Sequence, residues 1–249
     1  MSTLQRVLAG LFLTCAAVWA QGSTAQITGT VKDASGLAIP GAEIKATQTA
    51  TGAVRNATSG SDGGYVLPNL PIGPWMLEIS KEGFSKYVQS GIILQVDSSP
   101  TVDATMKVGA VTDQVTVQAD AALVETHSTG VGQVVDSQRV VEMPLNGRNP
   151  TELIFIAGMA NLSPAGAVGS INSVRNYPTV VISVAGGIGN GVTYLLDGAN
   201  HNDAANNLNL PLPFPDALQE FKVETSALPA QYGYHSAAAV NAVTKSGTN

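Results

Sequence analysis

The stretch ITGTVKDASGLAIPGAEIKA, residues 27–46, decides the fold of the first part of this chain. From Ile27 to Val31 small or apolar residues alternate with polar ones, which is typical of a strand with one buried face. The segment KDASG supplies turn residues, and the alternation resumes from Ala42 to Ala46. Two short strands joined by a turn are therefore predicted here.

The same pattern, short alternating segments separated by turn residues, continues for about sixty residues. SDGGYVL, residues 61–67, predicts an Asp-Gly turn that enters a strand, and further short strands are expected at IILQV (92–96) and TVDATMKV (101–108). In PIGPWMLEIS, residues 71–80, Trp75 is in phase with two aliphatic residues, so we expect a core tryptophan rather than an exposed platform for a sugar. Short strands with turns every 8 to 12 residues or so predict a β-sandwich.

Four motifs in residues 27–84 resemble those of the carboxypeptidase regulatory-like domain. They are G-x-V-x-D, P-G-A-x-I, D-G-x-Y and a final G-F. The resemblance implies a prealbumin-type, Ig-like sandwich over residues 26–108, in a family grouped with carbohydrate-binding folds. It implies no peptidase, and the chain has no H-x-x-E or H-E-x-x-H pair to hold zinc.

Residues 1–20 predict a secretory signal peptide, because Arg6 precedes an apolar run at 7–18 and small residues follow. Cleavage after Ala25 is the alternative. Cys15 suggests a lipoprotein anchor, but the residues before it fit such a site poorly. It is the single cysteine of the chain, so the exported protein would have neither disulfides nor thiol chemistry.

Composition excludes several classes of partner. Only 12% of the residues are charged and the formal net charge is −6, which gives no electrostatic support for binding nucleic acid or an anionic membrane. The 26 glycines and 13 prolines favour short strands and turns over a helical bundle.

The junction AVTDQVTVQADAALVET, residues 110–126, lies in an expected linker over 109–125. One interpretation is a strand of the sandwich or of the next domain. The other is a segment that resembles the TonB box of outer-membrane receptors, which would add as a strand to the periplasmic protein TonB. The candidate TonB-contact residues are Asp113, Gln114, Val115, Thr116, Val117, Gln118 and Ala119.

The second half predicts a mixture of short helices and strands. VVEMPLNGRNPTELIFIAGM (140–159) has a helical segment that ends at Pro144, then an N-cap at Asn149 with Pro150 at N1 and Glu152 reaching back. The cap favours a helix over a strand for the apolar residues that follow. Further strands are expected at 179–187 and 191–200, and an edge strand at 238–244. DALQEFKVETS (216–226) is expected to begin with a short helical turn and to continue as a strand in which Phe221, Val223 and Thr225 alternate with polar residues.

Three stretches of the second half resemble the plug domain of TonB-dependent outer-membrane transporters of the Oar-like kind. They are MPLNGRNPTEL (143–153), YLLDGANHND (194–203) and residues 214–249. The resemblance implies an α+β plug with a small mixed sheet over 126–249, and a following barrel of about 22 strands that would enclose it. Partners would be TonB, that barrel and a small substrate such as a sugar, peptide or chelate.

The loop at residues 199–215 contains five asparagines and three prolines. In the plug family such a loop faces the substrate, whereas the alternative is a solvated turn region that tolerates asparagine. The candidate ligand-facing residues are Asn200, His201, Asn202, Asp203, Asn206 and Asn207.

No enzyme is predicted, and no cofactor. Gly187 and Gly189 start a dinucleotide fingerprint whose third position is Val192, and no G-x-S-x-G motif occurs. The three histidines are too far apart for metal ligands, so no catalytic or metal residue is assigned.

The sequence thus predicts a β-rich, two-domain chain. Its expected function is that of the periplasmic and plug portion of an outer-membrane transporter, which gates uptake and is exported to the outer membrane. The alternative is a free-standing exported module that binds a carbohydrate or peptide and transports nothing.

Overall fold

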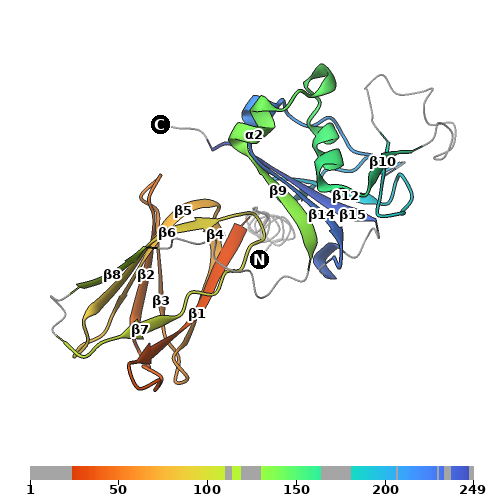
Figure 1. Ribbon diagram of the computed structural model, residues 1–249. Coiled ribbons are helices and arrows are strands. Elements are labelled where there is room, and N and C mark those ends of the chain that lie inside the picture. The colour runs from red at the N-terminus through yellow and green to blue at the C-terminus, as the bar shows by residue number, and fades with distance from the viewer. Residues whose placement is uncertain are drawn as a thin grey trace, which may run out of the picture. The chain divides into compact units, whose positions relative to one another are not determined.

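The computed structural model describes residues 24–109, 114–118, 130–163, 181–205, 207–228, 230–232 and 237–246. They form two compact units (Figure 1). The first unit comprises Thr24–Val134 with residues 227–231, and the second comprises Val135–Ser226 with the residues from Tyr232 onward.

The first unit is a sandwich of two sheets, as predicted. Most neighbouring strands are antiparallel, but β7 pairs with β1, and β8 with β6, in parallel. The smaller sheet has the order β4-β1-β7, with bounds Gly64–Pro71, Thr24–Asp33 and Ala104–Met106. The larger has the order β3-β2-β5-β6-β8, with bounds Val54–Thr58, Glu43–Gln48, Gly73–Ser80, Lys86–Leu94 and Gln114–Gln118.

The inward positions of these strands build one apolar core, and the alternation expected from the sequence is present in β1, β2 and β5. Trp75 is only 1% exposed, and its indole Nε1 donates a hydrogen bond to the Pro71 carbonyl at 2.9 Å. The prediction of a core tryptophan is therefore confirmed.

Sterics explain why glycine occupies two positions of the sequence motifs. A Cβ on Gly29 would lie 1.9 Å from the Val102 carbonyl oxygen, so only glycine lets β1 approach the segment before β7 this closely. Gly63 has a φ of +74°, and a Cβ there would lie 2.5 Å from the Val31 oxygen. The G-x-V-x-D and D-G-x-Y patterns thus mark close backbone contacts.

The second unit has a five-stranded mixed sheet with the order β13-β12-β15-β14-β9. Strand β15 pairs in parallel with β12 and antiparallel with β14, so it lies in the middle of the sheet. The expectation of an edge strand is wrong, because pairing depends on partners distant in sequence. The strand bounds are Ala199–Asn200 for β13, Val192–Leu196 for β12, Ala238–Thr244 for β15, Leu218–Ser226 for β14 and Val131–Asp136 for β9.

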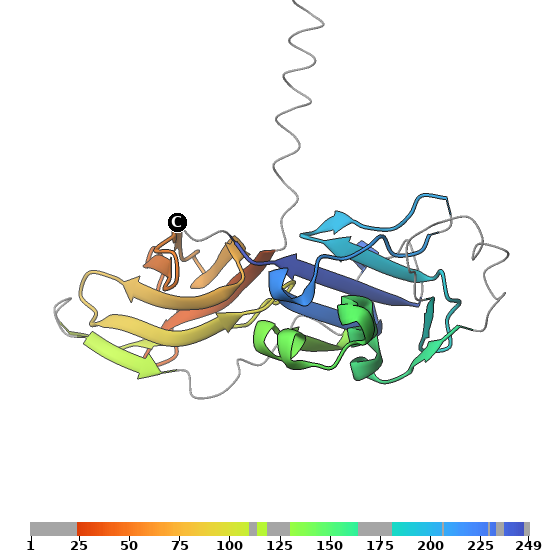
Figure 2. The same ribbon diagram turned by 90° about the horizontal axis from the view of Figure 1, so that it is seen from above.

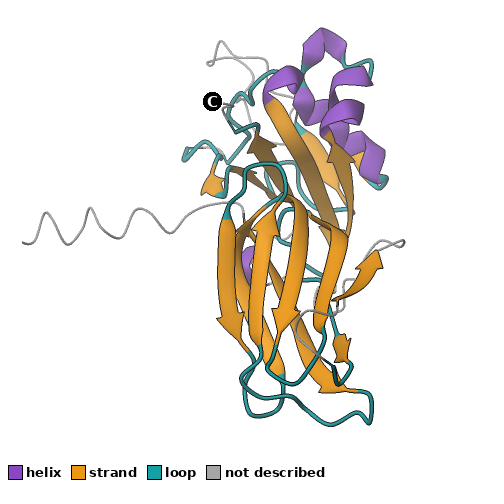
Figure 3. Ribbon diagram, turned by 90° about the vertical axis from the view of Figure 1, so that its left-hand side faces the viewer, coloured by secondary structure: helices purple, strands orange, loops and turns teal. Residues whose placement is uncertain are grey.

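Short helices cover one face of this sheet, as Figures 2 and 3 show in green and purple. Val140 of α2 and Leu153 and Ile154 of η3 join the core that Phe221 and Val240 build from the strands. Strands β10 and β11, which follow η3 along the chain, pair with each other in a small antiparallel sheet. The bounds are Ser137–Glu142 (α2), Asn146–Arg148 (η2), Pro150–Ala157 (η3), Ala160–Leu162 (β10), Ile182–Val184 (β11) and Pro215–Ala217 (η5). A further short helix, η6 (Ala230–Tyr232), has its first two residues in the first unit and Tyr232 in the second.

The predicted cap at Asn149 is present. Its side chain accepts a hydrogen bond from the Thr151 amide at 3.1 Å, and Pro150 opens the helix, which is a 3₁₀ rather than an α-helix. The Glu152 carboxylate reaches back past the cap and accepts from the Asn146 amide at 2.8 Å. The segment NGRNPTE is therefore a closed local hydrogen-bonded unit.

Asp197 ties a turn to the end of the central strand. It has a φ of +52° in the turn between β12 and β13. Its carboxylate accepts hydrogen bonds from the Thr244 amide at 2.8 Å and from the Thr244 hydroxyl at 2.9 Å. This side chain fixes where β15 ends.

Candidate functional site

The middle of the candidate TonB-contact segment is strand β8, the edge strand of the larger sheet in the first unit. Its residues pair in parallel with β6, from Lys86 with Gln114 to Ser90 with Gln118. Asp113 and Ala119 lie outside the described residues. The interpretation as a sandwich strand thus fits residues 114–118, while their contact with TonB stays a prediction.

The three β8 side chains that the structure describes, at positions 115–117, are less buried than Val88 and Gln89 of the neighbouring strand β6. Val115 is half-buried, Thr116 is exposed and Val117 is 38% exposed. On β6, Val88 is 5% and Gln89 7% exposed. The chain therefore presents this segment on the surface, with its backbone hydrogen-bonded into a sheet.

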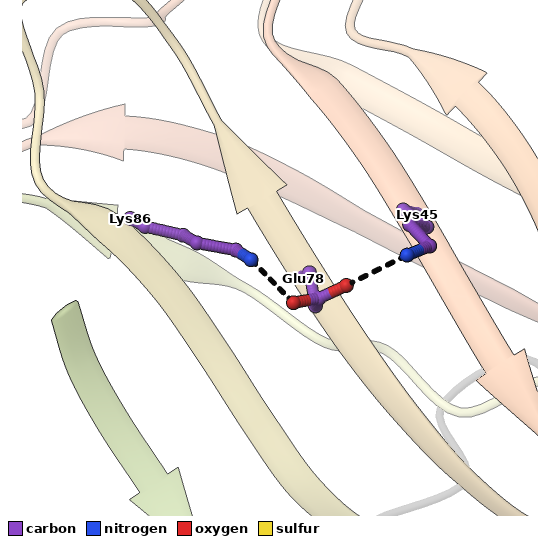
Figure 4. Close-up of polar contacts among 3 residues, drawn as sticks. All are labelled: Lys45, Glu78 and Lys86. Carbon is purple, nitrogen blue, oxygen red and sulfur yellow. Dashed lines mark hydrogen bonds and ion pairs between the residues drawn. The ribbon is translucent and has the colours of Figure 1, made fainter. Parts of the chain in front are cut away.

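Next to β8, three charged side chains bridge strands β2, β5 and β6 (Figure 4). Glu78 lies between two lysines, and its carboxylate contacts the Lys45 ammonium at 3.3 Å and forms a shorter ion pair with Lys86. The hydrogen bond from Lys86, followed by the one from Lys45, holds the pKa of the Glu78 carboxyl below its ordinary value against the opposing effect of burial. We call Lys45, Glu78 and Lys86 the charged triad.

The charged triad lines a groove of about 430 Å³ on the outer face of the sheet, which we call the polar groove because most of its lining residues are polar or charged. Among the residues that the structure describes, no aromatic ring lines it, which disfavours a stacking platform for a sugar. Sequence reasoning missed this groove, although the alternation of β2 and β5 places its charges on the solvent face. The lining residues are Glu43, Ile44, Lys45, Asn56, Ala57, Thr58, Glu78, Ser80 and Lys86.

The structure brings most of the asparagine-rich loop together, and the side-chain amides of Asn202 and Asn207 bond mainly to the backbone of strand β12 and of the residues just before it. Asn202 accepts a hydrogen bond from the Tyr194 amide at 2.7 Å and donates to the carbonyls of Val192 at 2.9 Å and Asn207 at 3.2 Å. Asn207 in turn donates to the Asn190 carbonyl. These amides hold the loop in shape.

The remaining loop residues lie around this centre. Asn200 is exposed and accepts from the Asn202 amide at 2.8 Å, while the His201 ring nitrogen Nε2 is 3.1 Å from the Pro211 carbonyl oxygen. Asp203 is buried and accepts from the Ala205 amide. Asn206 lies outside the described residues. A ligand-facing role for the loop stays a prediction, in which Asn200 is the most accessible of the candidate residues that the structure describes.

Two further properties of the structure bear on other functions. Within the part of the chain that the structure describes, no three His, Cys, Asp or Glu side chains are grouped so as to hold a metal ion. Among the same residues, no helix is both long and apolar enough to span a membrane.

Comparison with known families agrees with the geometry of the first unit. The family model of the carboxypeptidase regulatory-like domain matches residues 26–107. Residues 26–107 form a carboxypeptidase regulatory-like domain. The charged triad and the polar groove therefore belong to the regulatory-like domain, and β8 extends its larger sheet beyond the matched residues.

A similar known protein covers both units. The chain is 29% identical over 248 residues to the TonB-dependent transporter Oar of Myxococcus xanthus. That match includes 98% of this chain but only 22% of the relative, so the chain spans about a fifth of the length of the transporter that it resembles.

Solved structures resemble about a third of the chain. They include the TIE protein of Bacillus anthracis (TM-score 0.30, 16% identity, 34% of this chain and 17% of that one). Another is hydroxyquinol 1,2-dioxygenase of Pseudomonas putida (TM-score 0.28, 14% identity, 35% of this chain and 57% of that one). A third is 5-hydroxyisourate hydrolase of Klebsiella pneumoniae (TM-score 0.29, 13% identity, 34% of this chain and 92% of that one). Likenesses this weak carry no argument about activity.

Proposed function

We propose that this chain is the periplasmic and plug portion of a TonB-dependent outer-membrane transporter, and that it gates substrate uptake in the intact protein. One observation carries the proposal: the identity to the Oar transporter runs through both units and not the regulatory-like domain alone. If the chain were a free-standing binding module, the similarity of its second unit to the transporter would be unexplained, so this alternative function is not favoured.

In this proposal residues 126–249, which include the second unit, are the plug, and a barrel of the same receptor encloses them. The mixed sheet with helices on one face is a compact body of the kind that could fill a barrel lumen. The asparagine-rich loop would face an unidentified small substrate such as a sugar, peptide or chelate, with Asn200 exposed to it. Residues 1–20 would direct export toward the outer membrane.

TonB would bind at the segment from Asp113 to Ala119. Strand addition uses main-chain hydrogen bonds for affinity and alternate side chains for specificity. Residues 114–118 have extended backbone, and Val117 is accessible to a partner. A pull on this segment would then be transmitted along the chain toward the plug.

A catalytic role is not part of the proposal. The presence of a regulatory-like domain and the likeness to a transporter both favour a role without catalysis. The dioxygenase and hydrolase likenesses are too weak to oppose them.

Titration of the chain with the periplasmic domain of TonB tests the proposal. We expect saturable binding that Val117→Asp weakens at least about tenfold, because a charge would replace an apolar contact in the added strand. The matched control is Val66→Asp, an exposed valine on β4 of the other sheet, which should leave binding unchanged. Equal effects of the two variants, or no binding at all, would contradict the proposed contact.

A further inference from the structure

The chain contains two Asn-Gly pairs, Asn146-Gly147 and Asn190-Gly191. An asparagine followed by a glycine can lose its side-chain amide, because the glycine amide nitrogen attacks the side-chain carbonyl carbon and closes a succinimide ring. Glycine favours this reaction, since it has no Cβ to obstruct the approach and adopts many backbone conformations. The two pairs are chemically identical, so a difference in their reactivity must come from the structure around them.

The first pair lies on the surface, and its reacting groups are unbonded. Asn146 and Gly147 are both exposed. Within the part of the chain that the structure describes, neither the Asn146 side chain nor the Gly147 amide forms a hydrogen bond. The amides on either side are engaged, because that of Asn146 donates to the Glu152 carboxylate at 2.8 Å. That of Arg148 donates to the Leu145 carbonyl at 3.1 Å. The Gly147 nitrogen is therefore available as a nucleophile.

The local backbone lets the two reacting groups meet. The helix η2 has only three residues, and Gly147 within it has a φ of 60° and a ψ of 19°, in the left-handed region. Hydrogen bonds in 3₁₀ turns have poor geometry, and a short exposed turn opens locally at low cost. Attack on the Asn146 side chain thus requires rotation within this turn and leaves the core of the second unit folded.

The second pair is held in a closed loop. Asn190 is half-buried and Gly191 is buried. The Gly191 amide donates to the Ile188 carbonyl at 2.9 Å. The Asn190 carbonyl accepts a hydrogen bond from the Asn207 side chain. A Cβ on Gly191 would lie 3.2 Å from that of Ala237, so the backbone is closely packed here. Attack by the Gly191 nitrogen requires the loss of its hydrogen bond and of this packing.

We propose that Asn146 is a site of spontaneous deamidation in the folded protein, and that Asn190 is protected. The Gly147 nitrogen forms a bond to Cγ of Asn146 and gives up its proton, while the Cγ–Nδ2 bond breaks and Nδ2 leaves with that proton as ammonia. Water then adds to one of the two ring carbonyls, and the ring opens to aspartate or isoaspartate. The reaction consumes only water, and it depends on the local structure and not on the proposed function.

Either product alters the hydrogen-bonded unit NGRNPTE. Aspartate adds a carboxylate to the residue whose backbone amide the Glu152 carboxylate accepts. Isoaspartate also inserts a methylene into the backbone before Gly147, which displaces the 146 carbonyl from the Asn149 amide that donates to it at 3.3 Å. We therefore expect η2 to open more often, and its ion pair from Arg148 to Asp216 of η5 to weaken.

Incorporation of a heavy oxygen isotope tests the site in the full chain. The protein, folded or unfolded in urea, is incubated in isotope-labelled water and then digested in ordinary water, so the label marks ring opening during the incubation. Trypsin releases position 146 in the peptide 140–148, where it is the single asparagine. In the folded protein, position 146 should be labelled at least about tenfold faster than position 190, because the reaction at Gly191 must first break a hydrogen bond and local packing. In urea the two positions should react at similar rates.

Asn146→Gln is the matched variant. It keeps a side-chain amide, but the larger ring that it would have to close forms far more slowly, so position 146 should stay unlabelled. The deamidated fraction carries an extra negative charge and is separated by anion exchange. Its Asn149 amide should exchange with solvent faster than in the parent or in Asn146→Gln.

The outcomes that contradict the proposal are specific. Equal labelling of positions 146 and 190 in the folded protein, or no label at position 146, would overturn the assignment of the site. Equal exchange of the Asn149 amide in the parent and deamidated fractions would overturn the effect on the hydrogen-bonded unit.

Discussion

Replacing Glu78 with glutamine should destabilise the regulatory-like domain measurably. The substitution keeps the side-chain volume but leaves Lys45 and Lys86 as two ammonium groups around a neutral amide. Partly exposed ion pairs are typically worth about 0.2–1 kcal/mol each, so the loss of two predicts about 1 kcal/mol. For a domain of this size that corresponds to a fall in Tm of about 4–8 °C at pH 7.

Tryptophan fluorescence follows this domain selectively. Trp75 is buried in the sandwich core, and Trp19→Phe removes the other tryptophan of the chain. The control is Glu43→Gln, which lines the same groove but forms no ion pair with the residues that the structure describes. It should shift Tm by less than about 2 °C, as is usual for surface substitutions.

The effect of Glu78→Gln must also depend on pH. The folded pKa of Glu78 is lowered from its ordinary value of 4.5, so the stability from its charge is fully present above that pH. It is lost as the pH falls through the lowered folded pKa. The difference in Tm between parent and variant should therefore be constant from pH 7 to about 5.5 and shrink below 4.5. Equal shifts for Glu43→Gln, or a difference in Tm that persists below pH 4.5, would show that the two ion pairs of Glu78 do not stabilise the domain.

Two further substitutions test the backbone contacts. Gly29→Ala places a methyl 1.9 Å from a backbone oxygen and should cost at least about 3 kcal/mol in urea unfolding followed by Trp75 fluorescence, whereas a cost under about 1 kcal/mol would contradict this packing. Asp197→Ala loses both hydrogen bonds to Thr244 and strains a residue at positive φ, so the second unit should lose about 2–3 kcal/mol, with faster exchange of the Thr244 amide. Asp197→Asn tolerates that φ and keeps one acceptor, so equal losses in the two variants would count against the clamp.

Local features of this fold could be read from the sequence because they depend on neighbours along the chain. Alternation gave the strands around Ile27, Ile44 and Trp75, whose side chains are buried as expected. The cap at Asn149 followed from residue types at fixed spacing. The fold class, a β-rich chain that begins with a sandwich, followed from many such signals together.

Strand pairing was not accessible in this way. Parallel pairing of β8 with β6 and the central place of β15 depend on residues far apart in sequence. A charged residue such as Glu78 on a solvent-facing position looks like any other until its cross-strand neighbours are known. Similarly, the asparagine count at 199–215 did not reveal that the Asn202 side chain bonds to the backbone of the preceding strand β12, at Val192 and Tyr194.

The most direct test of the central claim is made in the native cell, with Val117→Cys introduced into the gene and single cysteines placed on TonB. Our account predicts that the protein fractionates with the outer membrane and forms a disulfide adduct with TonB, while Val66→Cys forms none. A soluble periplasmic protein without an adduct at position 117 would contradict it.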